Sequence, residues 1–256
     1  MCQNPGCSCS DHSQADDHSH DHSHDHSHDH GHDHGHAPGP LTLAVNRSLL
    51  EKNDGLAERN RRLFRAKKLL VLNVVSSPGS GKTTFIGETA AKLAGQLRLG
   101  VIVGDLATDN DAARLRMAGI PVVQITTGTV CHLEADMIAK AAAKLDLDQL
   151  DVLVIENVGN LVCPADFDLG EALRVVLLST TEGEDKPLKY PPMFHSAHVA
   201  VINKTDLADA AGFNRGQALA NLKRISHHAL IFEVSAKTGA GMAAWLDFLK
   251  QQRARL

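Results

Sequence analysis

Residues 16–36 alternate histidine with small or acidic residues, DDHSHDHSHDHSHDHGHDHGH, in a pattern suited to binding divalent metal ions. Neutral imidazole is a good ligand for Ni²⁺ and Zn²⁺, and the aspartate spacers attract cations and keep the segment in solution. Purification tags are usually unbroken histidine runs, so the alternation favours a native segment. Many overlapping ligand sets on a flexible chain predict modest, exchangeable nickel-storage sites at His18, His20, His22, His24, His26, His28, His30, His32, His34 and His36.

Three cysteines precede the histidines in MCQNPGCSCS and add soft thiolate ligands, which makes Cys2, Cys7 and Cys9 possible nickel ligands. Residues 1–40 contain no Val, Ile or Phe, so they cannot bury enough apolar area to offset the entropy of ordering. We therefore expect two parts: a disordered Cys/His-rich metal-binding segment at 1–40, and a folded domain with N-terminal helices at 41–256.

The stretch SSPGSGKTT, residues 76–84, follows an apolar strand pattern and precedes a helical one, which is the context of a phosphate-binding P-loop. Glycines let the backbone amides curl around phosphates, Lys82 is expected to reach the β- and γ-phosphates, and the Thr83 hydroxyl to bind Mg²⁺. Ser76 stands where the usual pattern has glycine. The predicted phosphate-binding residues are Gly79, Ser80, Gly81, Lys82, Thr83 and Thr84.

The motifs NKTD (203–206) and SAK (235–237) follow two later strand patterns and favour guanine over adenine. A carboxylate at Asp206 can accept hydrogen bonds from guanine N1–H and N2–H₂, a donor pair that adenine lacks. The predicted base-binding residues are Asn203, Lys204, Asp206, Ser235, Ala236 and Lys237. With the P-loop, these motifs predict a GTPase that binds GTP and GDP.

Two acidic residues end strand patterns and are candidates for catalysis and for holding Mg²⁺: Asp105 in GVIVGDL and Glu156 in DVLVIEN. Lys82 is the third predicted catalytic residue. The stretch that Glu156 opens stands where many GTPases carry Asp-x-x-Gly, so the Gly159 amide is expected to sense the γ-phosphate. Asp109 and Asp111 are weaker candidates, because acids are common in the first turn of a helix.

Cys131-His132 and Cys163 form a second group of possible metal ligands. Free cysteines are often buried small hydrophobes, but two thiolates and an imidazole suit Zn²⁺ or Ni²⁺. The pair at 131–132 is expected to open a helix, whose N-terminus lowers a thiol pKa. Three ligands are one short of four-coordination, so water, another side chain or a second subunit must supply the fourth.

Apolar runs that alternate with helical patterns position these motifs. Residues 42–67 read as two helices divided at Asn53-Asp54-Gly55, and the Pro-rich residues 182–194 read as a loop. The alternation predicts an α/β fold with a mainly parallel sheet flanked by helices, as in P-loop NTPases, and ligands at the carboxyl ends of its strands. The expected strands are LLVLNVV, GVIVGDL, PVVQIT, DVLVIEN, RVVLLST, HVAVINK and ALIFEVS.

Composition narrows the function classes further. The formal net charge is −4 and the pI about 6.4, which argues against nucleic-acid and anionic-membrane partners. The start lacks the apolar core of a signal peptide, and no apolar run reaches the length of a membrane helix of about 20 residues. We expect a cytoplasmic protein whose cysteines are thiols or metal ligands.

Taken together, the His-rich start, SSPGSGKTT, GDLATDNDAARL, Cys131-His132, ENVGNLVCP and NKTD resemble the HypB family of hydrogenase nickel-incorporation GTPases over residues 42–256. The resemblance implies a slow SIMIBI-class GTPase that dimerises with GTP and holds Ni²⁺ or Zn²⁺ at the dimer interface. The implied interface ligands are Cys131, His132 and Cys163, and the implied partners are a HypA-like zinc metallochaperone and the precursor of the [NiFe]-hydrogenase large subunit. Some members bind nickel at an N-terminal C-x-x-C-x-C, whereas the spacing here is Cys2-x4-Cys7-x-Cys9.

Two other functions remain open at this stage. A urease-type nickel GTPase is the first, although its relatives usually carry Cys-Pro-His, and this chain has Cys-His and a separate Cys-Pro. The second is a nickel store whose GTPase domain is regulatory. The placement of Cys163 four residues after Gly159 favours a carrier, because nucleotide exchange should then move a metal ligand.

Deleting residues 1–36 should strongly lower the nickel bound per chain and leave GTP turnover nearly unchanged, because metal storage and catalysis lie in separate segments. Metal analysis and phosphate release on both forms test this separation, and a loss of turnover would contradict it. Nickel uptake by the full chain should fade below pH ~6, as imidazoles become protonated.

Overall fold

Parallel strands form the central layer of the part of the chain described by the computed structural model, residues 40–105 and 109–256, with side chains from Arg47 onward. Within these residues seven strands pair in the order β3-β2-β4-β1-β5-β6-β7, and every pairing is parallel. The predicted ligands Cys2, Cys7 and Cys9 and the ten histidines of residues 18–36 lie outside the described residues. The strands are β1 (Leu70–Ser76), β2 (Leu99–Asp105), β3 (Val122–Thr126), β4 (Val152–Gly159), β5 (Leu173–Ser179), β6 (Val199–Asn203) and β7 (Leu230–Glu233).

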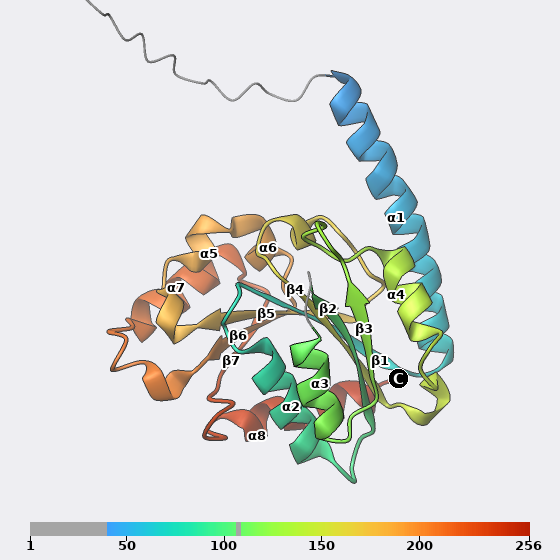
Figure 1. The fold of residues 1–256 in the computed structure, drawn as a ribbon. Helices are drawn as coiled ribbons and strands as arrows, with labels where there is room; N and C mark the ends of the chain where they lie inside the picture. Colours follow the sequence, from blue (N-terminus) through green and yellow to red (C-terminus); the bar gives the residue numbers. More distant parts are fainter. Residues whose placement is uncertain (1–39, 106–108) are drawn as a thin grey trace, which may run out of the picture. The chain divides into compact units, whose positions relative to one another are not determined.

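Helices cover both faces of this sheet (Figure 1), so the predicted α/β fold with a parallel sheet is confirmed. On one face lie α2 (Lys82–Leu93), α3 (Asn110–Met117) and α8 (Met242–Arg253). The other face carries α1 (Pro40–Ala66), α4 (Ala135–Ala142), α6 (Pro191–His195) and α7 (Arg215–Ile225). Short helical segments complete the described fold: Leu147–Gln149, Cys163–Ala165, Thr180–Glu182, α5 (Lys186–Lys189) and Thr205–Leu207.

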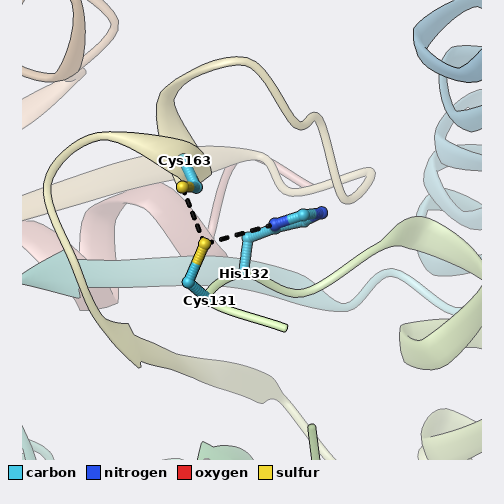
Figure 2. A group of neighbouring side chains, drawn as sticks. All are labelled: Cys131, His132 and Cys163. Atoms are coloured by element: carbon cyan, nitrogen blue, oxygen red, sulfur yellow. Dashed lines mark hydrogen bonds between the residues drawn. The ribbon is translucent and has the colours of Figure 1, made fainter. Parts of the chain in front are cut away.

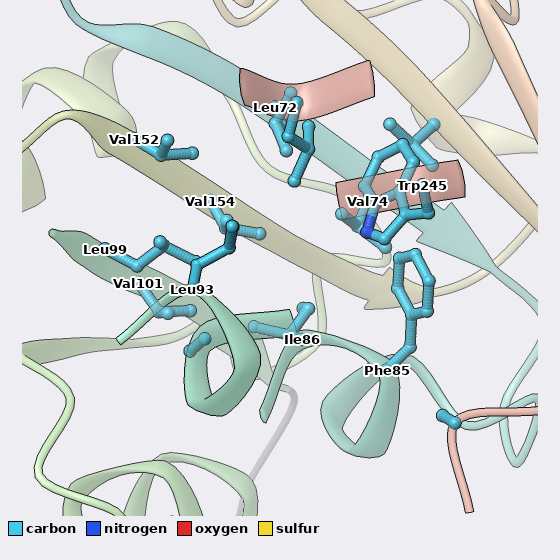
Figure 3. Packing of buried hydrophobic residues seen from close by; sticks show 14 of the residues in the cluster. Leu72, Val74, Phe85, Ile86, Leu93, Leu99, Val101, Val152, Val154 and Trp245 are labelled. Carbon is cyan, nitrogen blue, oxygen red and sulfur yellow. The ribbon is translucent and has the colours of Figure 1, made fainter. Parts of the chain in front are cut away.

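Side-chain alternation along the strands divides the core between the two faces. In β1, Leu72 and Val74 point to the face of α2 and α8, whereas Val71 and Val75 join apolar clusters on the opposite face. Figure 3 shows the first cluster, in which the Trp245 ring of α8 packs against Phe85, Leu72 and Val74. Strand β1 is therefore buried on both faces, which explains its nearly continuous apolar sequence.

The carboxyl ends of the strands gather the predicted motifs at one edge of the sheet. The P-loop follows β1, Asp105 ends β2, Gly159 ends β4, and Asn203 ends β6. Because all strands are parallel, these ends lie on the same side, as the sequence predicted.

The predicted division of the first helix at residues 53–55 is wrong, because α1 runs unbroken from Pro40 to Ala66. Asn53 is 5 % exposed; its Nδ2 donates to the Asp168 carbonyl at 2.8 Å, and its Oδ1 accepts from the Ala135 amide at 2.9 Å. Glycine costs roughly 1 kcal/mol inside a helix, and these buried tertiary contacts offset the penalty at Gly55. Asn53 therefore attaches α1 to the start of α4.

The Pro-rich segment 182–194 is also more regular than predicted, since it contains α5 and α6. Pro187, Pro191 and Pro192 lie in the first turns of these helices, where a missing amide hydrogen costs nothing. Across the described residues, no helix combines the length and apolarity that a membrane span requires.

Replacing Asn53 by Ala should lower the free energy of unfolding by about 2 kcal/mol, because it leaves a buried amide and a partly buried carbonyl without partners. Urea denaturation without nucleotide measures the change. The exposed neighbour Asp54→Ala is the matched control, and equal stability losses in the two variants would contradict the role of Asn53.

Candidate nucleotide and metal sites

A cavity of about 490 Å³ lies between the P-loop and the ends of β2 and β4. Gly79 and Gly81 adopt positive φ values of 74° and 94°, so the loop needs glycine at both positions. A β-carbon on Gly81 would lie 2.8 Å from Asn203 Nδ2, which ties this glycine to the base-binding motif. The cavity is lined by Pro78, Gly79, Gly81, Lys82, Thr83, Thr84, Gly104, Asp105, Asp111, Arg114, Glu156, Asn157, Val158, Gly159 and Lys204.

Ser76, the departure from the usual P-loop pattern, fits inside the loop. Its side chain is fully buried, its hydroxyl accepts a hydrogen bond from Lys82 Nζ at 3.0 Å, and it contacts the Ser80 hydroxyl. Ser80 is buried as well and donates to the Ser77 carbonyl at 3.0 Å. The Ser76 hydroxyl thus holds the lysine within the loop, a role that glycine cannot fill.

The residues around Thr83 fit a magnesium ion. Thr83 Oγ1 donates to Glu156 Oε1 at 2.6 Å, and the second oxygen, Oε2, is buried without a hydrogen-bond partner among the described residues. Burial raises the pKa of Glu156 to about 7, against the opposing effects of Thr83 and Lys82. Burial also lowers the pKa of Lys82. Bound Mg²⁺ would satisfy the unpaired oxygen and favour the ionised carboxylate, with Asp105 on the same cavity wall.

A smaller adjoining cavity of about 230 Å³ is lined by residues of the two motifs that the sequence predicts to bind the base. Asn203 Nδ2 donates to the Ser80 carbonyl at 3.0 Å, and Lys204 Nζ donates to the Gly79 carbonyl at 2.7 Å, so NKTD is bound to the P-loop. Ser235 Oγ donates to Asp206 Oδ1 at 2.5 Å and fixes the carboxylate that is predicted to read guanine. The cavity is lined by Gly81, Thr84, Asn203, Lys204, Asp206, Leu207, Ala236 and Lys237.

Two residues that line the cavity of about 490 Å³ were predicted weakly or not at all from the sequence. Asp111, only a weak candidate from its place in a helix start, lies on the cavity wall, and Arg114 one turn later lines the same wall. Nothing in the local sequence distinguishes Arg114 from a solvated helix arginine. A hint lies in their spacing, since residues three apart on a helix share one face.

Cys131, His132 and Cys163 meet in one chain, although 32 residues separate the two cysteines. Cys131 Sγ lies 2.7 Å from Cys163 Sγ and 4.0 Å from His132 Nδ1. Figure 2 marks both contacts with dashed lines. One ligand atom from each side chain lies within 4.8 Å of the others. The structure thus brings together the three residues that the sequence proposed as metal ligands.

The predicted helix start at Cys131 is wrong, because α4 begins at Ala135. Cys131 lies in the preceding loop, where no helix dipole lowers its pKa. Instead, the contact with Cys163 raises the pKa of the Cys131 thiol, and burial adds to the effect. The two sulfurs are in direct contact, and a divalent ion bound between them would displace the thiol protons.

Neighbouring side chains orient the three ligands. The His132 ring stacks on Phe167 with centroids 3.9 Å apart, and its buried Nε2 has no hydrogen-bond partner among the described residues. Glu134 Oε1 lies 3.7 Å from that nitrogen, and desolvation lowers the pKa of His132. A neutral imidazole with a free nitrogen is the form that binds metal.

The fold and the larger cavity define a P-loop nucleotide-binding protein, and comparison with known proteins narrows this class. A family model described as "CobW/HypB/UreG, nucleotide-binding domain" matches residues 70–233. The chain is 52% identical over 211 residues to the hydrogenase maturation factor HypB of Escherichia coli K12, covering 82% of this chain and 73% of that protein. It is 41% identical over 218 residues to the hydrogenase/urease maturation factor HypB of Helicobacter hepaticus, covering 84% and 89%.

Two solved structures of HypB proteins are similar to this chain in fold and sequence. The crystal structure of HypB from Helicobacter pylori in complex with nickel matches with a TM-score of 0.77 and 41% identity, over 80% of this chain and 96% of that one. HypB from Archaeoglobus fulgidus matches with a TM-score of 0.75 and 41% identity, over 79% and 99%. The chain belongs to the HypB family of hydrogenase maturation factors, which are P-loop GTPases.

Raising the pH from about 4.5 to about 7 should lower the stability of the metal-free, nucleotide-free protein through Glu156, by at most about 3 kcal/mol. The folded carboxyl keeps a proton that the unfolded chain loses near pH 4.5, so unfolding releases a proton throughout this window. Above pH 7 the Glu156 carboxyl is ionised in both the folded and the unfolded protein, so its contribution to stability no longer changes with pH.

Urea denaturation in EDTA from pH 5 to pH 8 measures the effect. Glu156→Gln should flatten the decline, whereas the exposed Glu51→Gln on α1 should leave it as in the native sequence. An unchanged profile in Glu156→Gln would contradict a proton held at this carboxyl.

Proposed function

We propose that this protein is a GTP-hydrolysing nickel carrier that binds Ni²⁺ at Cys131, His132 and Cys163 and releases it during [NiFe]-hydrogenase maturation. The observation that carries the proposal is that Cys163 meets its two partner ligands in the same chain, four residues after Gly159. The printed names of the relatives, hydrogenase maturation factor and a complex with nickel, support both halves of it.

The nucleotide half of the proposal assigns each residue a task. Lys82 and the P-loop amides bind the phosphates, Asp206 selects guanine, and Thr83 with Glu156 holds Mg²⁺, with Asp105 directly or through water. Bound Mg²⁺ would neutralise charge on the transferring phosphoryl group. Hydrolysis gives GDP and phosphate, and positioning by Lys82 and the metal supplies most of the catalysis, so turnover is slow.

The metal half depends on the spacing of the two sulfurs. A tetrahedral ion with metal–sulfur bonds of about 2.3 Å holds its sulfurs about 3.8 Å apart, close to their van der Waals contact, and the sulfurs of Cys131 and Cys163 are already in contact. Metal–ligand distances tolerate deviations of only about 0.2 Å, and binding also requires the loss of the thiol protons. A small movement of either loop therefore changes the metal affinity.

The chain segment after β4 connects the proposed nucleotide site to the proposed metal site. A β-carbon on Gly159 would lie 3.1 Å from Pro78 of the P-loop, so this glycine packs directly on the phosphate-binding loop. Between Glu156 and Gly159 the pairing of β4 with β1 shifts by one residue, a bulge that frees the strand end from the regular ladder. A change at the γ-phosphate can then move Gly159 and, with it, Cys163.

We further propose that two copies associate when GTP is bound and that the second copy or a water completes the metal coordination. Zn²⁺ suits the same ligand set and would compete with Ni²⁺. The proposed partners are a HypA-like zinc metallochaperone, which receives the nickel, and the hydrogenase large-subunit precursor. The proposed location is the cytoplasm, where residues 1–40 act as a metal reservoir joined to the GTPase domain at 41–256.

Urease maturation is the second candidate, and the name of the Helicobacter hepaticus relative favours it specifically. The two functions share the nickel site and differ in the acceptor. Nickel transfer to a hydrogenase precursor and to metal-free urease, measured side by side, distinguishes them. A pure nickel store would transfer to neither acceptor in response to GTP.

Nickel affinity at the inner site should differ at least about tenfold between the GDP form and a form with a non-hydrolysable GTP analogue, or about 1.4 kcal/mol. The full chain carrying Cys2→Ser, Cys7→Ser and Cys9→Ser keeps only Cys131 and Cys163, so the thiolate–nickel absorption band reports this site alone. Equal affinities in the two forms would contradict the carrier function, and Cys163→Ala, which removes a ligand, is the control for the band.

A further inference from the structure

Asn160 joins the two loops that carry the thiols. Its Nδ2 donates to the carbonyl of Cys131 at 3.2 Å, and its Oδ1 accepts from the amide of Val162, next to Cys163, at 2.9 Å. One side chain therefore holds the backbone of the first cysteine and the backbone beside the second. Asn160 lines neither nucleotide cavity and is not among the metal ligands.

The far end of the Cys163 loop is fixed by contacts among residues that line neither nucleotide cavity. Arg174 is 6 % exposed, and its guanidinium donates to the carbonyls of Ala165 at 3.0 Å and Phe167 at 2.8 Å. Glu171 pairs with Arg174 at 2.9 Å, with both side chains nearly buried. Breaking such a buried ion pair is costly, so this end of the loop is a rigid anchor.

A second buried contact holds β4 near its carboxyl end. Asn157 Nδ2 donates to Asn73 Oδ1 at 3.1 Å, and Asn73 Nδ2 donates to Glu171 Oε1 at 3.1 Å. The bulge of β4 and the loop beyond Ala165 thus belong to one hydrogen-bonded framework. Between these fixed points lie Gly159, Asn160 and Cys163, the stretch that can move relative to both.

We propose that Asn160 is the positioning residue through which the nucleotide state, sensed at Gly159, sets the spacing of the Cys131 and Cys163 thiols. The inference rests on the proposed nickel-carrier function and names its coupling element. Asn160 follows Gly159 directly, so a displacement of the glycine reaches its side chain without an intermediate. Through the bond to the Cys131 carbonyl, the same displacement reaches the opposite loop.

Two substitutions test the two hydrogen bonds made by the Asn160 side chain. Asn160→Ala removes both, so each cysteine loop relaxes on its own and the thiol spacing no longer depends on the nucleotide. Asn160→Asp keeps an acceptor for the Val162 amide but loses the donor to Cys131, placing a carboxylate against a carbonyl. In both variants the nickel affinity should no longer depend on the nucleotide, because both lose the hydrogen bond from Asn160 to the Cys131 carbonyl that transmits the change.

The test measures nickel affinity through the thiolate–nickel absorption band, in the full chain with Cys2, Cys7 and Cys9 replaced by Ser. Affinities are compared between GDP and a non-hydrolysable GTP analogue. The parent protein should show a ratio of at least about tenfold, and both Asn160 variants a ratio within about twofold of one. The affinity of each Asn160 variant for GDP checks that the variant is folded, and it should equal that of the parent. GDP lacks the phosphate that Gly159 is expected to sense.

The matched control is Asn214→Ala, which removes a comparable side-chain hydrogen bond at the start of α7, where Asn214 Oδ1 accepts from the Gln217 amide at 2.9 Å. Its affinity ratio should equal that of the parent. A parent ratio retained in Asn160→Ala, including an equal weakening of both affinities, would overturn the coupling role and leave the carrier function standing. A ratio of one in the parent itself would overturn the carrier function and, with it, this inference.

Discussion

The hydrogen bond from Thr83 Oγ1 to Glu156 Oε1, 2.6 Å long and shielded from water, is the contact on which the arrangement of both sites depends. It joins the first turn of α2 to the end of β4, and so the P-loop to the strand that leads toward Cys163. A buried carboxyl with one unpaired oxygen is energetically costly, which is why its pKa rises to about 7 in the metal-free protein. In the proposed function a divalent ion and a nucleotide would complete this site, and the strand end would respond directly to their binding.

The proposed metal ligands lie close to that strand end because only a few residues separate Gly159 from Cys163. Gly159 packs on Pro78, Asn160 bonds to the Cys131 loop, and Cys163 follows within four residues. The remainder of the loop is fixed by Arg174 and Glu171. Packed interiors shift between discrete arrangements rather than deforming smoothly, so a displacement of about 1 Å suffices to make or lose a thiolate ligand.

Most of the fold was predictable, because apolar strand runs and phosphate-loop glycines are local signals. Every expected strand is present, and the motifs meet at the carboxyl edge as parallel pairing requires. Tertiary contacts decided the rest: Asn53 keeps α1 continuous, and α4 begins four residues beyond Cys131. The roles of Ser76 and Asn160 depend on partners brought close only by folding, so no spacing in the sequence indicates them. The proposed metal ligands were predictable as a set, but their 2.7 Å sulfur contact was not.

Nickel K-edge X-ray absorption tests most directly whether the metal site changes with the nucleotide. The sample is the full chain with Cys2, Cys7 and Cys9 replaced by Ser, loaded with one nickel ion per inner site, with GDP or with a non-hydrolysable GTP analogue. We predict that the number of sulfur ligands, or the nickel–sulfur distance, differs between the two forms. Identical sulfur coordination in both would contradict the coupling of the two sites.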